Sequence, residues 1–541
     1  MSPARTVADA VAESAASRGI HHVFGLPGGE TIPLIEAFRQ RGVSFVLGKH
    51  ETFAGFMAEA YGLATGQPGV VLTTRGPGAT NLVTAVAHAY LDRSPLVALT
   101  GSGGEGPQVQ FPHETLDLRA LYAPITKWSA ALTPTDADLT LEQAFALAAA
   151  EPPGPVHLTL SGEHAEADVE PPNVTGRRGQ RRSVPEPDAR SIERLTDRIR
   201  SAKRPVILAG AGVVRSGAAE ALILLATRRR IPVAVTMKAK GVFPEDDRLF
   251  LGVVGFTTRQ ERQISAVFQG SDLVLLIGYD AVEVLPPWQR MLAALRPLAA
   301  ISHSPVRERY AGLEVEVVGD IAAILSRLLE EVGAGEGPGW HAGGAEVPAA
   351  VRGATAGMGN GILPVAAAFR ALQAGCPEET VLCVDVGSHK VAVAALWISR
   401  RPGYIRVSNG LSAMGYALPA AIGTALARPG APVMALMGDG GFYMAGFELE
   451  TALRLGVSLV LAVLCDGLYH RIQMKQADRG YPPVGVAFAV PDVVGVARAL
   501  GAAAHRVSDP EDLTAACRQG FERNMVTVVE VRIDPEGYLA L

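Results

Sequence analysis

The amino-acid sequence predicts an α/β protein made of three doubly wound parallel-sheet units. Apolar strand-like runs alternate with helical patterns along the chain, which is typical of parallel sheets covered by helices. Two linker-like stretches divide this alternation into three parts, and 541 residues are enough for three or four ordinary domains. Because open α/β sheets bind ligands where their strands end, we expect functional residues in the turns that follow the strands.

The composition excludes several classes of protein. With a net charge of −5 and an isoelectric point near 6.2, the chain lacks the basic character expected of a nucleic-acid-binding protein. We expect neither a membrane span nor a targeting signal, because no stretch of about 18 uninterrupted apolar residues occurs and no basic segment precedes an apolar run at the N-terminus. Four cysteines without metal-ligand spacing fit a reducing compartment, so we expect a cytoplasmic protein.

The first unit is predicted at residues 1–165. Two glycine-rich turns at 24–29 and 75–81 each stand after an apolar strand and before a helix, where an α/β sheet binds its ligand. The strand-like runs in this unit are 70–73 and 96–99, and the helical patterns are 51–63 and 79–90.

A linker rich in Pro, Arg, Gly and Glu is predicted at about 165–188, followed by a second unit at 190–332. The turn at 210–217 superficially resembles a dinucleotide-binding loop, but its imperfect glycine spacing favours an ordinary strand-to-helix turn. A second linker at 333–357 leads to a third unit at 358–541. The strands of these two units are predicted at 205–209, 232–235, 273–277, 314–318, 380–384, 433–437, 459–464 and 526–531.

The tripeptide Gly438-Asp439-Gly440 directly follows one predicted strand of the third unit, and Asp466 follows the next strand. Two parallel strands joined by one helix place both carboxylates at the same edge of the sheet. Gly-Asp-Gly alone is common in turns, but a second acid at the next strand end strengthens the prediction. Two carboxylates, a backbone carbonyl, diphosphate oxygens and water would complete an octahedral Mg²⁺ site. The pattern therefore predicts a Mg²⁺ and phosphate site at this edge.

The segment from Gly438 to Asp466 resembles the motif that binds metal and thiamin diphosphate in the thiamin-diphosphate-dependent decarboxylase and carboligase family. The resemblance implies that Asp439 and Asp466 are metal ligands and that the backbone carbonyl of Leu468 is a third. Cys465 stands where many members carry Asn. Since the family assigns metal ligation to the second position of that pair, we expect the Mg²⁺ site to be retained.

Four further segments resemble the same family and occur in its order. Residues 49–61 resemble the helix with the catalytic glutamate, 76–81 the loop beside the cofactor's pyrimidine, 385–389 a segment that contacts the diphosphate, and 408–415 the support of the bent cofactor. Each alone has an ordinary structural explanation, such as a helix-start acid or a core methionine; five matches in order favour the family. The implied cofactor-binding residues are Gly28, Pro77, Asn81, Ser388, His389, Met414, Gly438, Asp439, Gly440, Gly441 and Tyr469.

The resemblance also implies how the site works. Glu51 is the expected catalytic residue, sharing a proton with the aminopyrimidine ring of thiamin diphosphate in a largely apolar environment. The first unit holds the pyrimidine end of the cofactor, the second is a central domain, and the third holds the diphosphate end. Because family members contribute the two ends from different subunits, we expect a homodimer or homotetramer with active sites at the subunit interface.

Within the family, local runs resemble the flavin-independent, catabolic type of acetolactate synthase most closely. The runs are 124–129, 277–283, 408–410 and 440–452. The flavin-containing type usually carries an Arg-containing run where Gly278-Tyr279-Asp280 stands, so FAD is not expected. The implied reaction is decarboxylation of pyruvate or a similar 2-oxo acid and transfer of the acyl unit to a second carbonyl.

Departures from the family leave the substrate open. Glu114 follows His113 where relatives commonly carry Gln, and both are candidate catalytic residues. Three roles of Glu114 stay open. Glu114 either transfers protons during the reaction, or disfavours a 2-oxo acid acceptor and favours a neutral or cationic one. In the third alternative it is protonated and replaces Gln as a neutral hydrogen-bonding group. The segment 469–476, which shapes the acceptor pocket in relatives, is unusually polar here. A solvated helix face explains that polarity equally well.

Other functions remain as alternatives at the level of sequence. A specialised carboligase is one, because 215–218 and 239–242 resemble carboxyethylarginine synthase, which joins a three-carbon unit to an amine. A simple 2-oxo acid decarboxylase is another. A non-enzymatic homologue is disfavoured by the intact Glu51, Asp439 and Asp466. A nicotinamide-dependent dehydrogenase would rest only on the weak glycine turn at 210–217.

Overall fold

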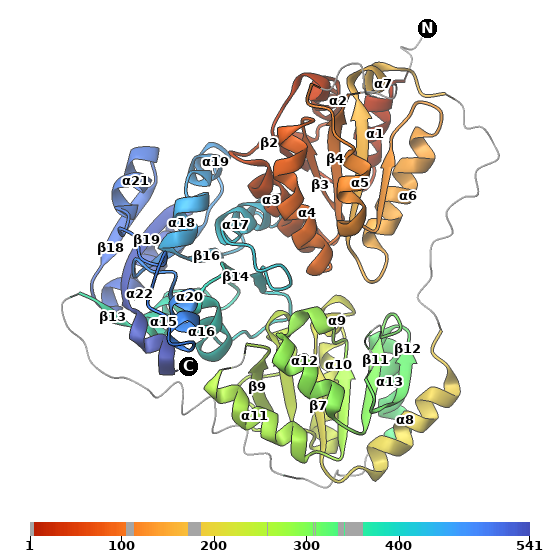
Figure 1. Ribbon diagram of the computed structural model, residues 1–541, viewed down its shortest axis with the longest axis vertical. Coiled ribbons are helices and arrows are strands. Elements are labelled where there is room, and N and C mark those ends of the chain that lie inside the picture. Colours follow the sequence, from red (N-terminus) through yellow and green to blue (C-terminus); the bar gives the residue numbers. More distant parts are fainter. Residues whose placement is uncertain are drawn as a thin grey trace.

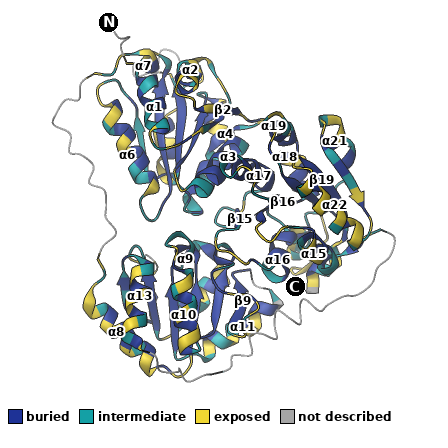
Figure 2. Cartoon of the chain, turned by 180° about the vertical axis from the view of Figure 1, so that it is seen from behind, coloured by how far each residue is buried: buried dark blue, intermediate teal, exposed yellow. Residues whose placement is uncertain are grey.

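The computed structural model describes residues 5–103, 113–170, 186–256, 258–306, 308, 310–333, 340 and 361–540. The chain forms three α/β domains, each with one sheet in which every pair of neighbouring strands is parallel, as predicted (Figure 1). In Figure 2 most of the strands are buried, whereas outer helices such as α8 and α6 expose one side. None of the described helices is both long and apolar enough to span a membrane.

The sheet of the first domain has the strand order β2-β1-β3-β4-β6-β5. Its strands are β1 (His22–Gly25), β2 (Ser44–Leu47), β3 (Gly69–Thr73), β4 (Leu96–Ser102), β5 (Trp128–Ala131) and β6 (Pro155–Ser161). Its helices are α1 (Val7–Ala16), α2 (Ile32–Gln40), α3 (Glu51–Thr65), α4 (Pro77–Leu91), α5 (Leu118–Tyr122), α6 (Ala137–Ala149) and α7 (Gly162–Glu166).

The middle domain has the strand order β12-β11-β10-β7-β8-β9. Its strands are β7 (Pro205–Ala209), β8 (Val233–Thr236), β9 (Phe250–Val254), β10 (Leu273–Ile277), β11 (Leu298–Ser302) and β12 (Leu313–Val318). Its helices are α8 (Ala189–Ser201), α9 (Ala211–Arg215), α10 (Ala219–Arg229), α11 (Arg259–Gly270), α12 (Pro286–Ala294) and α13 (Ile321–Val332).

The sheet of the third domain has the order β13-β19-β17-β16-β14-β15, and β18 also pairs with β19. Its strands are β13 (Leu363–Pro364), β14 (Val381–Val384), β15 (Ile405–Val407), β16 (Val433–Gly438), β17 (Val460–Cys465), β18 (Ala503–Val507) and β19 (Thr527–Asp534). Its helices are α15 (Val365–Ala374), α16 (Ser388–Leu396), α17 (Ala417–Ala427), α18 (Asp439–Ala445), α19 (Glu448–Arg454), α20 (His470–Ala477), α21 (Val493–Leu500) and α22 (Pro510–Glu522).

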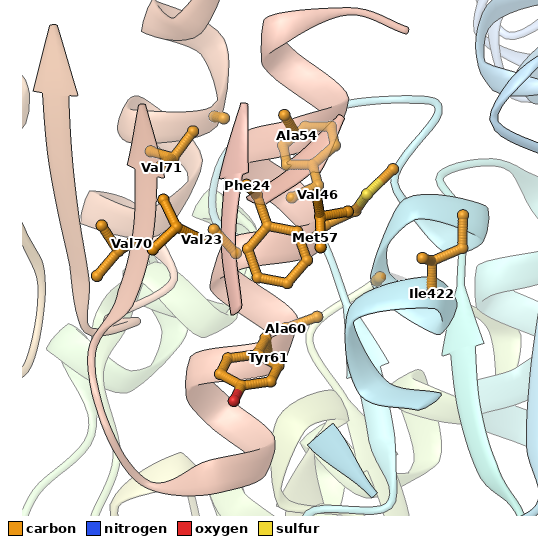
Figure 3. Packing of buried hydrophobic residues seen from close by; sticks show 14 of the residues in the cluster. Val23, Phe24, Val46, Ala54, Met57, Ala60, Tyr61, Val70, Val71 and Ile422 are labelled. Carbon is orange, nitrogen blue, oxygen red and sulfur yellow. The ribbon is translucent and has the colours of Figure 1, made fainter. Parts of the chain in front are cut away.

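The first and third domains share a core because α3 packs between its own sheet and α17. Met57 of α3 lies between Phe24 of β1 and Ile422 of α17, and all three side chains are buried (Figure 3). The two helices approach so closely that a Cβ atom on Gly423 would lie 2.1 Å from the carbonyl oxygen of Met57. Only glycine fits there. The helix that begins at Glu51 is therefore held from both sides.

Each predicted strand overlaps an observed one. The turn after β7 leads into α9, which confirms the prediction of an ordinary strand-to-helix turn. At this point a Cβ atom on Gly212 would lie 2.6 Å from the Cα atom of Gly278, and the cavity beside it measures only about 10 Å³. The predicted linkers at 165–188 and 333–357 fall largely outside the described residues, so the domain boundaries stay predictions.

Candidate active site

A cavity of about 540 Å³ opens at the C-terminal edge of the third sheet. It lies where the neighbouring parallel strands β14, β16 and β17 end, and it also touches the middle domain at Gly255, Phe256 and residues 282–286. The structure brings one predicted set of residues together around it. The set comprises Ser388, His389, Met414, Gly438, Asp439, Gly440, Gly441, Asp466, Leu468 and Tyr469.

Asp439 and Asp466 lie at the ends of adjacent strands, as the sequence predicts. Oδ2 of Asp439 accepts hydrogen bonds from the backbone N–H groups of Asp466 at 3.1 Å and Gly467 at 2.8 Å. Burial raises the pKa of Asp439, and burial together with the charge of Asp439 raises the pKa of Asp466 to about 7. Two carboxylates that disfavour each other's ionisation make a suitable site for a divalent cation, which would balance both charges.

This pair does not form a complete metal site from side chains alone. Among the described residues, no group of three or more His, Cys, Asp or Glu side chains is placed to hold a metal ion. Leu468 lines the cavity, and its backbone N–H donates to Oδ1 of Asp466 at 3.0 Å, which fixes the turn between β17 and α20. The remaining ligands of a Mg²⁺ ion would therefore be backbone, water and phosphate oxygens.

The glycines of the motif are required by close contacts with their neighbours. A Cβ atom on Gly440 would lie 2.6 Å from Cε1 of Tyr469, and one on Gly441 would lie 2.3 Å from Oδ2 of Asp385. The Tyr469 ring packs against Phe488 with the ring centroids 5.0 Å apart. The first turn of α18 therefore presents bare backbone to the cavity.

His389 offers a second indication of a ligand. Its side chain lines the cavity, and the buried Nε2 has no hydrogen-bond partner. Burial lowers the pKa of His389 to about 4, so the ring is neutral at pH 7. The neighbouring Ser388 begins α16 and lies 2.9 Å from Nδ1 of His470 through its hydroxyl. A buried nitrogen without a partner and the free N–H groups of a helix start suit phosphate oxygens.

Met414 lines the cavity on a loop that Asp385 holds in place. The buried Asp385 carboxylate accepts hydrogen bonds from the backbone N–H of Gly415 at 3.0 Å and of Tyr416 at 3.4 Å. Burial raises the pKa of Asp385 to about 7. Asp385 was predicted as part of the segment that contacts the diphosphate. Its role as the anchor of the loop that carries Met414 was not predicted.

The residues predicted for the pyrimidine end gather in the first domain. Glu51 is the first residue of α3 and only 8% exposed, and Asn81 Nδ2 donates to its Oε2 at 3.0 Å. A Cβ atom on Gly78, the residue after Pro77, would lie 3.4 Å from Glu51 Oε1. Thr74 connects this group to Gly28, because a Cβ atom added to Gly28 would lie 2.2 Å from Oγ1 of Thr74. Oε1 of Glu51 makes no hydrogen bond to a described residue and is available to a ligand.

Glu114 and His113 have different surroundings. Arg75 Nε donates to Glu114 Oε2 at 3.1 Å, and a Cβ atom on Gly76 would lie 3.0 Å from the Glu114 Cβ atom. Glu114 thus lies beside the predicted pyrimidine loop, with its charge balanced by Arg75. The side chain of His113 is 85% exposed and lies 3.9 Å from Glu114 at Nε2. Within one chain, His113 is not part of the group around Glu51.

The two groups of predicted residues do not share a cavity within one chain. None of Gly28, Glu51, Pro77, Asn81 and Glu114 is among the described residues that line the cavity of the third domain. The predicted site residues therefore form two separate groups in the chain, called half-sites below: one at the start of α3 and one at the edge of the third sheet.

Three cationic residues that were not predicted as site residues also line the cavity: Lys390, Arg471 and Lys475. Arg471 and Lys475 belong to α20, a helix whose polar sequence does not show which face is turned inward. The sequence signals for this helix were the resemblance, which places 469–476 at the acceptor pocket, and its unusual polarity, which a solvated face explained equally well. The structure shows that part of this helix faces the cavity.

All three domains match protein-family models of one kind. Residues 5–120 match the N-terminal TPP binding domain of thiamine pyrophosphate enzymes, 192–328 match the central domain, and 385–531 match the C-terminal TPP binding domain. Thiamine pyrophosphate (TPP) is another name for thiamin diphosphate. The two TPP-binding matches contain Glu51 and the Asp439–Asp466 pair, respectively.

Full-length relatives agree with these matches. The chain is 30% identical to an acetolactate synthase of Bacillus subtilis, over 97% of this chain and 93% of the relative. It is 32% identical to an acetolactate synthase large subunit of Corynebacterium glutamicum, over 97% and 86%. It is also 31% identical to a probable 2-ketoarginine decarboxylase of Pseudomonas aeruginosa, over 97% and 94%.

Proposed function

Since this chain belongs to the thiamine pyrophosphate enzyme family that includes the acetolactate synthases, we propose that it is a Mg²⁺-dependent carboligase. It decarboxylates pyruvate or a similar 2-oxo acid and transfers the acyl unit to a second carbonyl. The observation that carries the proposal is the pair of the buried Asp439 and the half-buried Asp466 beside the unpartnered Nε2 of His389, in a cavity of the domain that matches the C-terminal TPP binding model.

The residues of the cavity fit thiamin diphosphate. Asp439 and Asp466, with the carbonyl of Leu468, would hold Mg²⁺, because their charges are not balanced within the chain. The bare backbone of Gly440 and Gly441 and the N–H groups at the start of α16 would receive the diphosphate. The bound cofactor supplies the electron sink that allows a 2-oxo acid to lose CO2.

Glu51 is the proposed proton-handling residue of the other half-site. Asn81 fixes Oε2, so the second oxygen can hold a proton shared with the aminopyrimidine ring. The position at the N-terminus of α3 stabilises a carboxylate, and its burial excludes water from that contact. The protein thus positions the reacting groups and excludes water from them, while the cofactor supplies the chemistry of the difficult bond cleavage.

The two half-sites are proposed to meet at a subunit interface, which makes at least a homodimer necessary. Apolar side chains support this, because they are exposed next to each half-site: Tyr443, Met444 and Phe447 follow Asp439, and Phe447 is 68% exposed. Leu47, close to Glu51, and Leu116, close to Glu114, are exposed in the first domain. Apolar patches beside incomplete sites are typical of interfaces.

The test is to incubate the protein with thiamin diphosphate, Mg²⁺ and pyruvate and to identify the products. We expect acetolactate, and we expect its formation to stop when a chelator removes Mg²⁺. CO2 release without acetolactate or acetoin would contradict the synthase proposal. Acetaldehyde as the sole product would instead indicate a simple decarboxylase.

A specialised 2-oxo acid decarboxylase is the second candidate, and the likeness to the probable 2-ketoarginine decarboxylase of P. aeruginosa favours it. A carboligase with an amine acceptor, similar to carboxyethylarginine synthase, is a third. A product screen that pairs pyruvate with aldehydes, 2-oxo acids and amines separates these candidates. We further propose that the enzyme acts in the cytoplasm and works without FAD, which flavin absorbance of the purified protein would test.

A further inference from the structure

Helix α20 turns a cationic face toward the cavity. Arg471, Ile472 and Lys475 line the cavity, whereas Gln473, Met474 and Gln476 do not. His470, the first residue of α20, also lines the cavity. Arg471 and Lys475 are spaced i and i+4, which places these two cations on the same side of the helix. Lys475 lies one helical turn beyond Arg471. The amide of Gln476, on another side, donates to the carbonyl oxygen of Val484 at 3.0 Å.

Neither cation on this face is neutralised by a described residue. Arg471 and Lys475 make no hydrogen bond or ion pair to the described part of the chain, in contrast to Arg93 and Arg215, which pair with Asp280 and Glu151. Burial lowers the pKa of Arg471, while the charges of Glu261 and Asp478 raise it. The oxygens of Glu261 are already used, because they accept hydrogen bonds from the backbone N–H groups of residues 255 and 256.

The other charged groups of the cavity are used elsewhere. Asp439 and Asp466 are assigned to Mg²⁺. The carboxylate of Glu283 accepts hydrogen bonds from Thr236 and from the backbone of residue 211, and so does not compensate the cations of α20. Lys390 donates from Nζ to the carbonyl oxygen of Ser408 at 3.0 Å. The cavity is therefore lined by three cations, of which Lys390 is held by a carbonyl oxygen, while Arg471 and Lys475 have no direct partner among the described residues.

Helix stability does not explain Arg471. It is the second residue of α20, where the unpaired N–H groups of the helix already carry partial positive charge, so a cation is unfavourable there. A half-buried guanidinium that lacks a direct partner among the described residues at such a position is suited to an anionic ligand.

We propose that Arg471 and Lys475 bind a second anionic group of the 2-oxo acid donor, at the end remote from its keto carbon. This inference rests on the proposed function and adds to it a preference, among the donors that the site accepts, for 2-oxo acids with an additional carboxylate. The reacting end lies toward the Mg²⁺ and cofactor residues, and the remote end lies along α20. Glu114 does not oppose a dianionic substrate, because Arg75 pairs with it.

The proposal separates this chain from one of its relatives. The P. aeruginosa relative is named for 2-ketoarginine, whose side chain ends in a cationic guanidinium group. Arg471 and Lys475 would repel that group and attract a carboxylate. Three 2-oxo acids with a five-carbon chain therefore compare an anionic, a neutral and a cationic end: 2-oxoglutarate, 2-oxopentanoate and 5-guanidino-2-oxopentanoate.

The first experiment measures kcat/KM for decarboxylation of these three acids by the full-length enzyme loaded with thiamin diphosphate and Mg²⁺. We expect 2-oxoglutarate to be preferred over 2-oxopentanoate by about 10- to 100-fold, and the guanidino acid to be the poorest substrate. In the double variant Arg471→Met/Lys475→Gln, the kcat/KM values for 2-oxoglutarate and 2-oxopentanoate should differ by no more than about threefold. Arg471→Lys should retain part of it, since the charge remains while the planar fork is lost.

The matched control is Arg479→Met, which removes one positive charge just beyond α20 from a residue that does not line the cavity. It should leave the preference unchanged. Equal kcat/KM values for 2-oxoglutarate and 2-oxopentanoate in the unmodified enzyme would overturn the proposal. The same conclusion would follow if the control lost the preference as fully as the double variant.

A binding measurement distinguishes the failure of this proposal from the failure of the proposed function. Glutarate and pentanoate lack the keto group, so calorimetry on the loaded protein reports binding without turnover. Tighter binding of glutarate, lost in the double variant, supports the cationic site even if no 2-oxo acid is decarboxylated, which would contradict only the proposed function. If Arg471→Met instead weakens thiamin diphosphate binding and keeps the preference for glutarate, Arg471 serves the diphosphate and the proposal is wrong.

Discussion

Two buried clusters of charged side chains differ in whether the chain balances their charge. The first joins Glu59 of α3, His88 and Asp92 near the end of α4, and Lys238 of the middle domain. His88 Nδ1 lies 3.0 Å from Asp92, Lys238 Nζ lies 3.0 Å from Asp92, and His88 Nε2 lies 3.6 Å from Glu59. The third domain contributes Tyr416, whose hydroxyl donates to Glu59 at 2.9 Å. This cluster is balanced and connects all three domains.

The second cluster is the Asp439–Asp466 pair, which has two acids and no ion pair with a cation of the described residues. The consequence appears in the pKa values, since burial and like charge raise that of Asp466, whereas Lys238 and His88 outweigh burial and hold that of Asp92 well below its usual range. A balanced buried cluster contributes to the folded state by itself, and an unbalanced one requires a ligand. The comparison therefore predicts that the first cluster governs stability and the second governs binding.

The largest effect is expected from Asp439→Asn. The variant keeps the size of the side chain and one acceptor oxygen but removes the charge that Mg²⁺ requires, so affinity for thiamin diphosphate with Mg²⁺ should fall by about 1,000-fold or more. The thermal midpoint of the cofactor-free protein should stay the same or rise, because a repulsive charge has been removed. Calorimetric titration and thermal unfolding measure the two effects.

Glu511→Ala is a suitable control for that variant, since Glu511 is an exposed acid in the first turn of α22. It should leave cofactor affinity unchanged. If Asp439→Asn bound the cofactor as well as the unmodified protein, Asp439 would not be a metal ligand and the comparison between the two clusters would fail.

His88→Gln should show the opposite pattern. Removing the cation leaves Glu59 and Asp92 less well compensated in a buried site, so the free energy of unfolding should fall by about 3 kcal/mol. Affinity for thiamin diphosphate should change much less than in Asp439→Asn. Urea denaturation of the cofactor-free protein measures the first quantity. A variant as stable as the unmodified protein would mean that the cluster contributes nothing to domain assembly.

The same histidine predicts a pH dependence of stability. Burial lowers the pKa of His88, but Asp92 and Glu59 outweigh it and raise the pKa to about 9, above the value of about 6.5 in an unfolded chain. The stabilising contribution is therefore complete below pH 6.5 and is lost as the pH rises through about 9. Urea midpoints should decrease over this range in the unmodified protein, and the decrease should be smaller in His88→Gln.

The difference between the clusters also explains what the sequence could predict. Asp439 and Asp466 were predictable because each follows an apolar strand, and consecutive parallel strands end at one edge of a sheet. The cluster around His88 was not, because only Asp92 stands at helical i, i+4 spacing from it, whereas Glu59 lies on another helix and Lys238 in another domain, where neither periodicity nor motif spacing connects them. The strands themselves were predictable because their buried runs are almost entirely apolar.

The walls of the cavity were harder to predict than its metal-binding edge. Helix α20 has eight residues and a polar sequence, so the identity of the face that meets the cavity depends on how the following segment packs. Asp385 was placed in the correct segment, but its hydrogen bonds to residues 415 and 416 come from tertiary structure alone. Local sequence thus indicates which residues stand at strand ends, and packing decides what faces them.

Glu51→Gln tests whether a carboxylate without a cationic partner requires a ligand at the start of α3 as well. Glu51 pairs only with the neutral Asn81, so its carboxylate should serve a ligand and not the fold. We expect exchange of the cofactor's C2 proton, followed by NMR, to slow by about 100-fold, with cofactor affinity and thermal midpoint nearly unchanged. Exchange at the unmodified rate would show that Glu51 is not the proton-handling residue.

The smallest effect is expected from Cys465→Ala, beside the metal pair. Cys465 precedes Asp466 and is buried, and burial raises the pKa of its thiol, so it remains neutral and adds no charge to the pair. Removing the sulfur should cost about 1 kcal/mol of stability through a small cavity. Affinity for Mg²⁺ and thiamin diphosphate should change by less than about threefold, because the unbalanced charge is intact. A tenfold loss in calorimetric titration would mean that the thiol ligates the metal. In that case the residues that bind Mg²⁺ would be those closest to the ion, and not only those whose charge the chain leaves unbalanced.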